Sequence, residues 1–300
     1  MIISMLRNWE KIESTHRRYL KKLLRDYYKS VENLYGPPSY TYFFLKKVHR
    51  LILSRSLNHY KKSIMILRNE VIKKNDKSFE ECLLRELKLI VNYDAFSRKG
   101  NGYNAYTLSK ESKLRTCPYC NHSFSITIDE SGRGFRPSLD HFYDKASYPH
   151  LGLSLYNLIP SCSSCNSSLK NINDFFEKDY LHPFFDAEEI IFKLSFQDKI
   201  HPLDIISGPV PSLRIDINSQ TTKAKNSADL FLIEARYQFF TNEARSLALA
   251  KLDFDEQVKR SKLLITNKLS EAISLRFDKN NYKNEMLGGL FKDIHDQFTL

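Results

Sequence analysis

The chain has 300 residues, of which 42% are hydrophobic and 27% are charged, so it has enough apolar material for a packed core and does not read as a disordered chain. It carries 46 Lys and Arg against 35 Asp and Glu, a formal charge of +11 that favours DNA or RNA over acidic small molecules as a partner. No apolar run reaches the 18 or so residues that a membrane span needs, and the apolar N-terminal stretch is too short for a signal peptide. We therefore expect a cytoplasmic protein with no membrane partner.

The positive charge lies in the first part of the chain. Residues 1–116 hold 25 Lys and Arg and 11 Asp and Glu, a balance of +14, whereas residues 117–300 hold 21 and 24, a balance of −3. Such asymmetry is typical of a basic arm or domain that binds nucleic acid. It is equally typical of a solvated helical surface, and the charge alone does not separate these two interpretations.

The apolar pattern predicts helices at both ends of the chain. Residues 8–35 are expected to form one helix, and a second helical stretch over about 42–93 is expected to divide at Asn75–Asp76. The turn residues Gly100–Gly102 then mark a boundary, which gives a basic helical N-terminal region over 1–100.

The rest of the chain is predicted to contain short strands followed by helices. A central region over 101–185 has short β-prone runs between turn residues, with a helix beginning near Ser161. A third region over 186–300 is expected to have one or two strands within 186–222 and helices beyond 227. Two apolar faces there, Leu230 to Phe240 and Val258 to Ile273, are either partner surfaces or ordinary core. The predicted fold class is α+β, mainly helical.

Four of the five cysteines form two Cys-x-x-Cys pairs, Cys117 with Cys120 and Cys162 with Cys165, while Cys82 stands apart. Two residues between thiolates allow a tight turn to place both sulfurs about 2.3 Å from one tetrahedral Zn²⁺, and two such pairs complete a closed structural site. Disulfides or chance burial of the thiols are the alternatives, and the cytoplasm disfavours disulfides. The spacing predicts a structural zinc site. The residues between the two cysteine pairs then form an insert that the zinc site holds.

The insert carries Asp140 next to His141, then Asn157, and Asn166 follows the second cysteine pair. A carboxylate and an amide oxygen, from Asp140 and Asn166, suit a hard divalent ion such as Mg²⁺ or Mn²⁺. Histidine titrates near neutrality, so His141 is a candidate to take a proton from an attacking water. Because neighbours in a regular strand point to opposite faces, we expect the strand to bend or end near Asp140.

The motifs CPYC, LDHFYDK and CSSCNSSLK, in that order, resemble the HNH endonucleases, which have a ββα-metal fold, and more narrowly the HNH nucleases of Septu-type and retron-associated anti-phage systems. The resemblance covers about residues 116–185 and implies a central zinc-clipped ββα-metal core. It implies Asp140 and Asn166 as metal ligands, His141 as general base and Asn157 as the residue that fixes the loop. It also implies an ATPase partner, ABC-type or AAA-like. One departure is Asp144, which stands where the family pattern leads us to expect proline.

Three further residues are secondary candidates. Lys145 and Lys170 either hold phosphates or are ordinary solvated lysines. His182, within Leu181-His182-Pro183, is expected to have a structural role or to support the residues of the site, rather than to act directly.

Two function classes remain open after these motifs. The first is a metal-dependent endonuclease that hydrolyses phosphodiester bonds of DNA or RNA as the effector of an anti-phage system. The second is a zinc-clipped module that binds nucleic acid or protein without cutting. A His141 substitution separates the two, because only the first predicts that cleavage is lost while binding survives.

Overall fold

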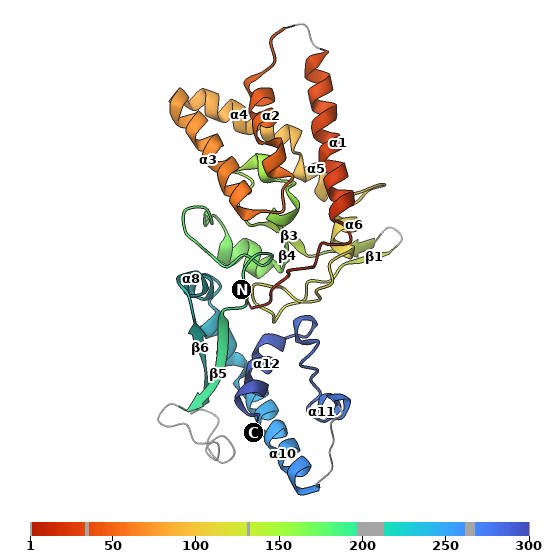
Figure 1. Cartoon of the computed structure of the whole chain (residues 1–300), viewed down its shortest axis with the longest axis vertical. Helices are drawn as coiled ribbons and strands as arrows, with labels where there is room; N and C mark the ends of the chain where they lie inside the picture. The colour runs from red at the N-terminus through yellow and green to blue at the C-terminus, as the bar shows by residue number, and fades with distance from the viewer. Residues whose placement is uncertain (1, 34–35, 131–132, 197–212, 262–267, 300) are drawn as a thin grey trace.

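The computed structural model describes residues 2–33, 36–130, 133–196, 213–261 and 268–299. It is 54% helical and 11% strand. In this part of the chain the strands form three separate two-stranded antiparallel sheets. The α+β, mainly helical class is therefore confirmed. Figure 1 shows the N-terminal helices at one end of the molecule, the small β3–β4 sheet in the middle and the C-terminal helices at the other end.

The N-terminal region is a set of packed helices: α1 (Glu13–Glu32), α2 (Tyr40–Ile52), α3 (Leu57–Lys74), α4 (Lys77–Ile90), α5 (Tyr93–Ser97) and α6 (Ala105–Lys110). The predicted division at Asn75–Asp76 is confirmed, because Asn75 adopts a left-handed conformation (φ 46°) and the Asp76 carboxylate caps the first turn of α4. A second break, between α2 and α3, was not predicted. The first helix starts at Glu13 rather than at residue 8, because residues 6–12 form turns, in which the amide of Asn8 donates to Met5 and that of Ile12 to Trp9.

The central region contains β1 (Ile128–Glu130), β2 (Arg133–Phe135), β3 (Ser138–His141), η1 (Pro149–Leu151), η2 (Leu155–Asn157), β4 (Leu158–Ser161) and η3 (Ser164–Lys170). β3 and β4 pair antiparallel, with Asp140 opposite Ile159. The helix predicted near Ser161 is present but begins at Ser164, and it is not an α-helix. Ser161 ends β4, and η3 is a π-helix in which the Asn171 amide donates to the Asn166 carbonyl five residues back.

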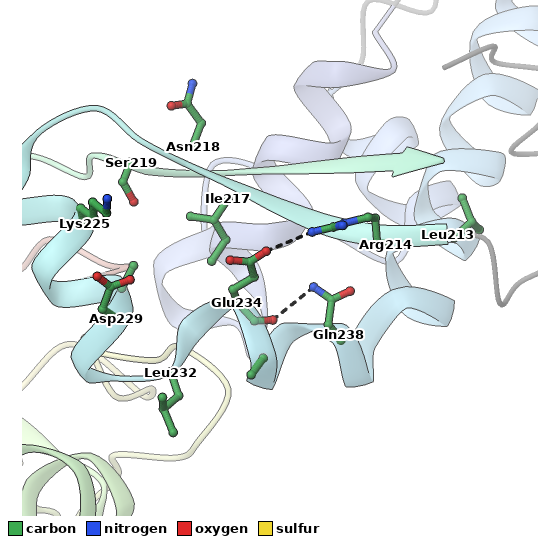
Figure 2. Close-up of a pocket in the computed structure, with 12 residues that line it drawn as sticks. Leu213, Arg214, Ile217, Asn218, Ser219, Lys225, Asp229, Leu232, Glu234 and Gln238 are labelled. Atoms are coloured by element: carbon green, nitrogen blue, oxygen red, sulfur yellow. Dashed lines mark hydrogen bonds and ion pairs between the residues drawn. The ribbon is translucent and has the colours of Figure 1, made fainter. Parts of the chain in front are cut away.

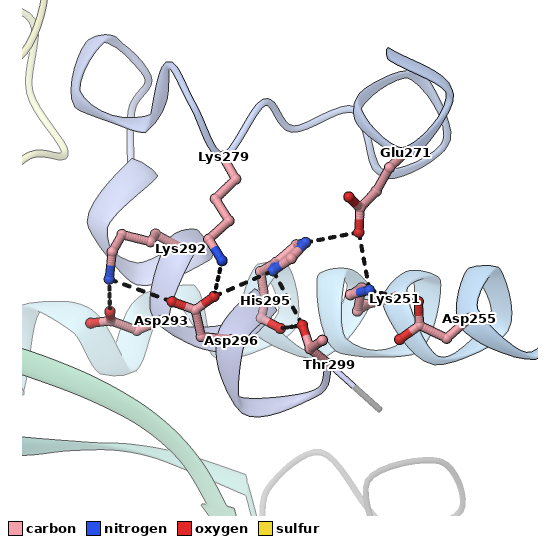
Figure 3. A network of polar contacts seen from close by, with 9 residues as sticks. All are labelled: Lys251, Asp255, Glu271, Lys279, Lys292, Asp293, His295, Asp296 and Thr299. Atoms are coloured by element: carbon pink, nitrogen blue, oxygen red, sulfur yellow. Dashed lines mark hydrogen bonds and ion pairs between the residues drawn. The ribbon is translucent and has the colours of Figure 1, made fainter. Parts of the chain in front are cut away.

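The C-terminal region contains β5 (Ile190–Phe196), β6 (Leu213–Ser219), α8 (Thr222–Leu230), α9 (Ile233–Tyr237), η5 (Gln238–Phe240), α10 (Thr241–Ser261), α11 (Lys268–Leu275), η6 (Tyr282–Asn284) and α12 (Gly288–Gln297). Both strands expected within 186–222 are present. A polar network joins the last three helices: buried Lys251 of α10 contacts Glu271 of α11, which also binds His295 of α12 (Figure 3). These charged contacts link the three helices in addition to their buried apolar side chains.

The two apolar C-terminal faces differ in exposure. Ile233 and Tyr237, in the first face, are fully buried, so these positions belong to the core of this chain. Leu232 breaks that face by adopting a left-handed conformation (φ 50°) between α8 and α9. In the second face Ile273 is 68% exposed, while Leu263 and Leu264 lie outside the described residues. Among the helices that the structure describes, none combines the length and apolar character needed to cross a bilayer.

Candidate functional site

The four paired cysteines meet in one cluster, although they come from segments far apart in the sequence. Cys117, Cys120, Cys162 and Cys165 bring their sulfur atoms within 4.8 Å of one another, and the Sγ atoms of Cys120 and Cys162 lie 3.9 Å apart. A tetrahedral zinc with Zn–S bonds of about 2.3 Å requires sulfurs about 3.8 Å apart. All four are free thiols. The cluster therefore has the composition and spacing to hold one Zn²⁺.

Polar groups around the cluster suit thiolates. The turn of the first pair closes where the Asn121 amide donates to the Cys117 carbonyl (2.7 Å), with Asn121 in a left-handed conformation (φ 52°). The amide of Cys165 donates to the sulfur of Cys162 (3.4 Å), and the guanidinium of Arg236 in α9 donates to the sulfur of Cys165 (3.5 Å). A zinc ion with four thiolates carries a net negative charge, which Arg236 offsets. Nothing in the sequence pointed to Arg236.

Asp140 is buried and holds two strong donors. Its side chain lies near the end of β3, and the residue is 3% exposed. Oδ2 accepts a hydrogen bond from the hydroxyl of Tyr119 (2.6 Å), and Oδ1 accepts one from Nζ of Lys170 (2.7 Å). Lys170 is buried as well, so it is a counter-ion within the site and not a solvated surface lysine.

His141 ends β3, as expected for a strand that must present two neighbouring side chains to one site. Its Nε2 lies 2.9 Å from the carbonyl oxygen of Gly152, which only accepts, so Nε2 carries the proton and Nδ1 keeps its lone pair. Burial lowers the pKa of His141 to about 4, and the Gly152 carbonyl opposes this only in part. The ring also packs edge-on against Tyr93 of α5, with ring centroids 4.3 Å apart. The imidazole is thus a neutral base with a fixed tautomer at pH 7.

Asn157 holds the loop between β3 and β4 and does not line the pocket that opens beside the end of β3. Its Oδ1 accepts from the amide of Tyr143 (2.7 Å), and its Nδ2 donates to the carbonyls of Tyr143 (3.0 Å) and Leu151 (3.1 Å). The side chain is completely buried. Its geometry is that of a residue that fixes the path of the loop, with no group left over for a reacting phosphate.

A pocket of about 310 Å³ opens beside the end of β3. It brings together five of the predicted residues: Asp140, His141, Lys145, Asn166 and Lys170. Among the other lining residues, Tyr93 and Ser97 of α5 and Arg136 just before β3 were missed. Tyr93 and Ser97 are distant in sequence from the motif, whereas Arg136 lies close to it, and nothing in the local pattern marks any of the three.

Lys145, Asp144 and His182 each have partners within the chain. Lys145 pairs with Asp94 (2.8 Å) at the rim of the pocket. The Asp144 carboxylate accepts from the amides of Ala146 (3.0 Å) and Ser147 (2.9 Å), so it builds the turn of its own loop. His182 is fully buried and packs against the ring of Phe142, with centroids 4.1 Å apart, and burial lowers its pKa to about 3.

A larger cavity, of about 1090 Å³, lies between β6 and helices α8 and α9 (Figure 2). Within it Arg214 pairs with Glu234 (3.1 Å), and Gln238 bonds both backbone groups of Ile215. No residue singled out in the sequence lines this cavity. Its size alone therefore does not make it a site.

The pocket at the end of β3 fits a hard divalent cation by its donor set. Asp140 supplies a carboxylate, and the Asn166 side chain is half-exposed and makes no hydrogen bond to any other described residue. Carboxylate and amide oxygens are the ligands that Mg²⁺ and Mn²⁺ prefer.

Comparison of the chain with protein-family models, with curated proteins and with solved structures finds no match.

Proposed function

We propose that the chain is a metal-dependent HNH endonuclease that hydrolyses phosphodiester bonds in nucleic acid. One observation carries the proposal: the neutral, buried His141 lines the same pocket as Asp140 and Asn166. A base with a free lone pair next to two oxygen ligands for a metal is an arrangement suited to hydrolysis of a phosphodiester. The cysteine cluster supports it by holding the start of η3, from which Asn166 projects.

In this proposal each residue has one task. Asp140 and Asn166 would hold a Mg²⁺ or Mn²⁺ ion, which supplies charge stabilisation to the phosphate and its leaving oxygen. Nδ1 of His141 takes the proton from the attacking water, while Nε2 stays bonded to Gly152 and keeps the ring oriented. Arg136 and Lys145 line the same pocket and offer positive charge to the flanking phosphates.

The surface of α1 supports nucleic acid as the substrate class. Arg17, Arg18, Lys21 and Lys22 are exposed on this helix and make no ion pair with any described residue. The apolar side of α1 is buried against the core, so the helix has no free apolar face with which to enter a membrane. Unpaired cations along a helix bind phosphates by releasing counter-ions, whatever the base sequence.

We further propose that the nuclease is the effector of an anti-phage system and works with an ATPase partner, similar to the Septu-type and retron-associated nucleases. This part rests on the resemblance of the motifs alone. An unregulated nuclease would damage its host, so the site is expected to be idle until the partner changes state. Co-purification from the native host, followed by nuclease assays with and without nucleotide, tests this. Robust cutting by the isolated chain at low concentration, with no partner co-purifying, would contradict it.

The alternative, a binding module without catalysis, has one observation in its favour. Both oxygens of Asp140 already hold donors within the chain. A direct assay separates the two functions: purified protein is incubated with plasmid, single-stranded DNA and tRNA, with Mg²⁺ or Mn²⁺ and with EDTA. Cleavage that requires the metal supports the nuclease. Binding to these substrates with no cleavage under any condition supports the alternative.

A further inference from the structure

The contact between Lys170 and Asp140 is the feature of the site that the proposed chemistry does not use. Nζ of Lys170 lies 2.7 Å from Oδ1 of Asp140, and each side chain is only 4% exposed. The same ammonium donates to the backbone carbonyl of His141 and lies 4.7 Å from the centre of the Phe175 ring. These partners hold the ammonium against the one carboxylate that is proposed to bind the metal.

The other oxygen of Asp140 also holds a donor. Oδ2 accepts from the hydroxyl of Tyr119 at 2.6 Å. The second carboxylate that lines the pocket, Asp144, is engaged with the amides of Ala146 and Ser147. In this arrangement a divalent cation therefore meets an Asp140 carboxylate whose charge is already paired with Lys170.

An ammonium and a divalent cation on Oδ1 of Asp140 repel each other strongly, because water does not screen the two charges in a buried site. On the proposed function, which this step rests on, Asp140 must nevertheless bind Mg²⁺ or Mn²⁺. We propose that Lys170 is a counter-ion gate: its ammonium occupies the cation position on Asp140, and a divalent cation binds only when Lys170 moves away.

The structure provides a destination for the displaced side chain. Lys170 is the last residue of η3 and lines the pocket of about 310 Å³ beside Asp140. Its flexible four-carbon stem allows the ammonium to move into that space without a change in the backbone. There it would face a bound phosphate, so cation and substrate together favour the open position. The gate thus links metal binding to the presence of a polyanion.

The gate predicts that removal of the charge on Lys170 tightens metal binding. Mn²⁺ is titrated into zinc-loaded protein and free Mn²⁺ is measured by electron paramagnetic resonance, for the parent chain, for Lys170→Met and for Lys61→Met. Lys170→Met is expected to bind Mn²⁺ at least about tenfold more tightly than the parent, equal to about 1.4 kcal/mol. Lys61→Met removes the same charge from an ion pair with Asp179 that does not line the pocket, and is expected to stay within about threefold of the parent. Zinc content and circular dichroism establish that each variant is folded.

A measurement on the unmodified chain covers the case in which Lys170→Met does not fold. Lysine amines are methylated with and without Mn²⁺, and the modification of Lys170 is read by mass spectrometry. Lys170 is expected to be protected without Mn²⁺ and modified when Mn²⁺ is present. Equal protection in both conditions, or equal Mn²⁺ affinity of the parent and Lys170→Met, overturns the gate but leaves the metal site. Failure of every variant to bind Mn²⁺ overturns both the gate and the proposed function.

Discussion

The hydroxyl of Tyr119 donates a 2.6 Å hydrogen bond to Oδ2 of Asp140. Tyr119 stands between the first two cysteines of the cluster, is fully buried, and stacks on the ring of Phe231 with centroids 4.5 Å apart. Burial raises the pKa of Tyr119 well above its usual value, so the hydroxyl stays a donor at any working pH. The cysteine cluster therefore positions Asp140 through Tyr119, in addition to holding η3 on the other side of the pocket.

Zinc content is the first prediction. We expect about one equivalent of Zn²⁺ per chain in freshly purified protein, because four thiolates in this geometry form a closed tetrahedral site. Cys162→Ser should lose the zinc and unfold the central region, since metal binding is coupled to folding. Cys82→Ser is the matched control, because Cys82 lies outside the cluster, and it should keep its zinc. Elemental analysis decides it, and less than about half an equivalent in the parent would contradict the prediction.

Asn157→Ala tests the role of Asn157 in fixing the loop. The substitution removes three buried hydrogen bonds and leaves the backbone groups of Tyr143 and Leu151 without that partner. We expect the free energy of unfolding to fall by about 2–4 kcal/mol, as measured by urea denaturation. Asn226→Ala removes one exposed hydrogen bond, to the carbonyl of Asp179, and should cost less than about 1 kcal/mol. Equal effects of the two variants would show that Asn157 does not hold the loop.

Stability is expected to fall as the solution becomes mildly acidic. Burial lowers the pKa of His16 to about 4 and those of His150 and His182 to about 3, from 6.5 in an unfolded chain. Below pH 6.5 the unfolded chain takes up protons that the folded chain does not, so stability is lost as the pH falls from 6.5 towards 4. Each histidine should cost about 1 kcal/mol between pH 7 and 5.5. Urea denaturation at both pH values, with zinc content checked, measures this; equal stability at both would contradict it.

The exposed cations of α1 predict salt-sensitive binding of nucleic acid. Binding is measured in EDTA, which prevents cleavage, over a range of salt concentrations. Neutralising Arg17, Arg18, Lys21 and Lys22 to Gln should reduce the slope of log affinity against log salt by about 2–4, because each lost phosphate contact on a duplex is worth about 0.9.

The control for this prediction changes the charge by the same amount elsewhere. Four exposed lysines outside the N-terminal region make no ion pair with any described residue: Lys178, Lys193, Lys225 and Lys259. Their replacement by Gln should leave the slope within about 0.5 of the parent. If both variants lower the slope equally, binding depends on the net charge of the whole molecule, and the cations of α1 form an ordinary solvated surface.

The features that sequence predicted best have few alternative chemical explanations. Four thiols in two Cys-x-x-Cys pairs have little other use than a metal, and they do meet in one cluster. The break at Asn75–Asp76 was visible because Asn tolerates a left-handed backbone and Asp caps helices. By contrast, the π-helical form of η3 leaves no pattern in seven residues that also suit an α-helix.

Contacts between distant residues were the part that sequence could not give. Lys170 pairs with Asp140 thirty positions away, and Tyr93 of helix α5 contacts His141 of strand β3. Lysine is usually solvated, so its local pattern argued against burial. Burial of a charge becomes favourable only when folding brings its partner to it, and that depends on the tertiary structure.

Metal-dependent cleavage by the parent chain and by His141→Ala tests the central claim most directly. Both proteins are assayed with Mg²⁺ or Mn²⁺, with His59→Ala as an exposed histidine control outside the pocket. We expect His59→Ala to cut like the parent, and His141→Ala to lose at least about a hundredfold in rate while binding the same substrate, because only the proton acceptor is removed. Cleavage by His141→Ala at the rate of the parent would contradict the assignment of this pocket as a nuclease site.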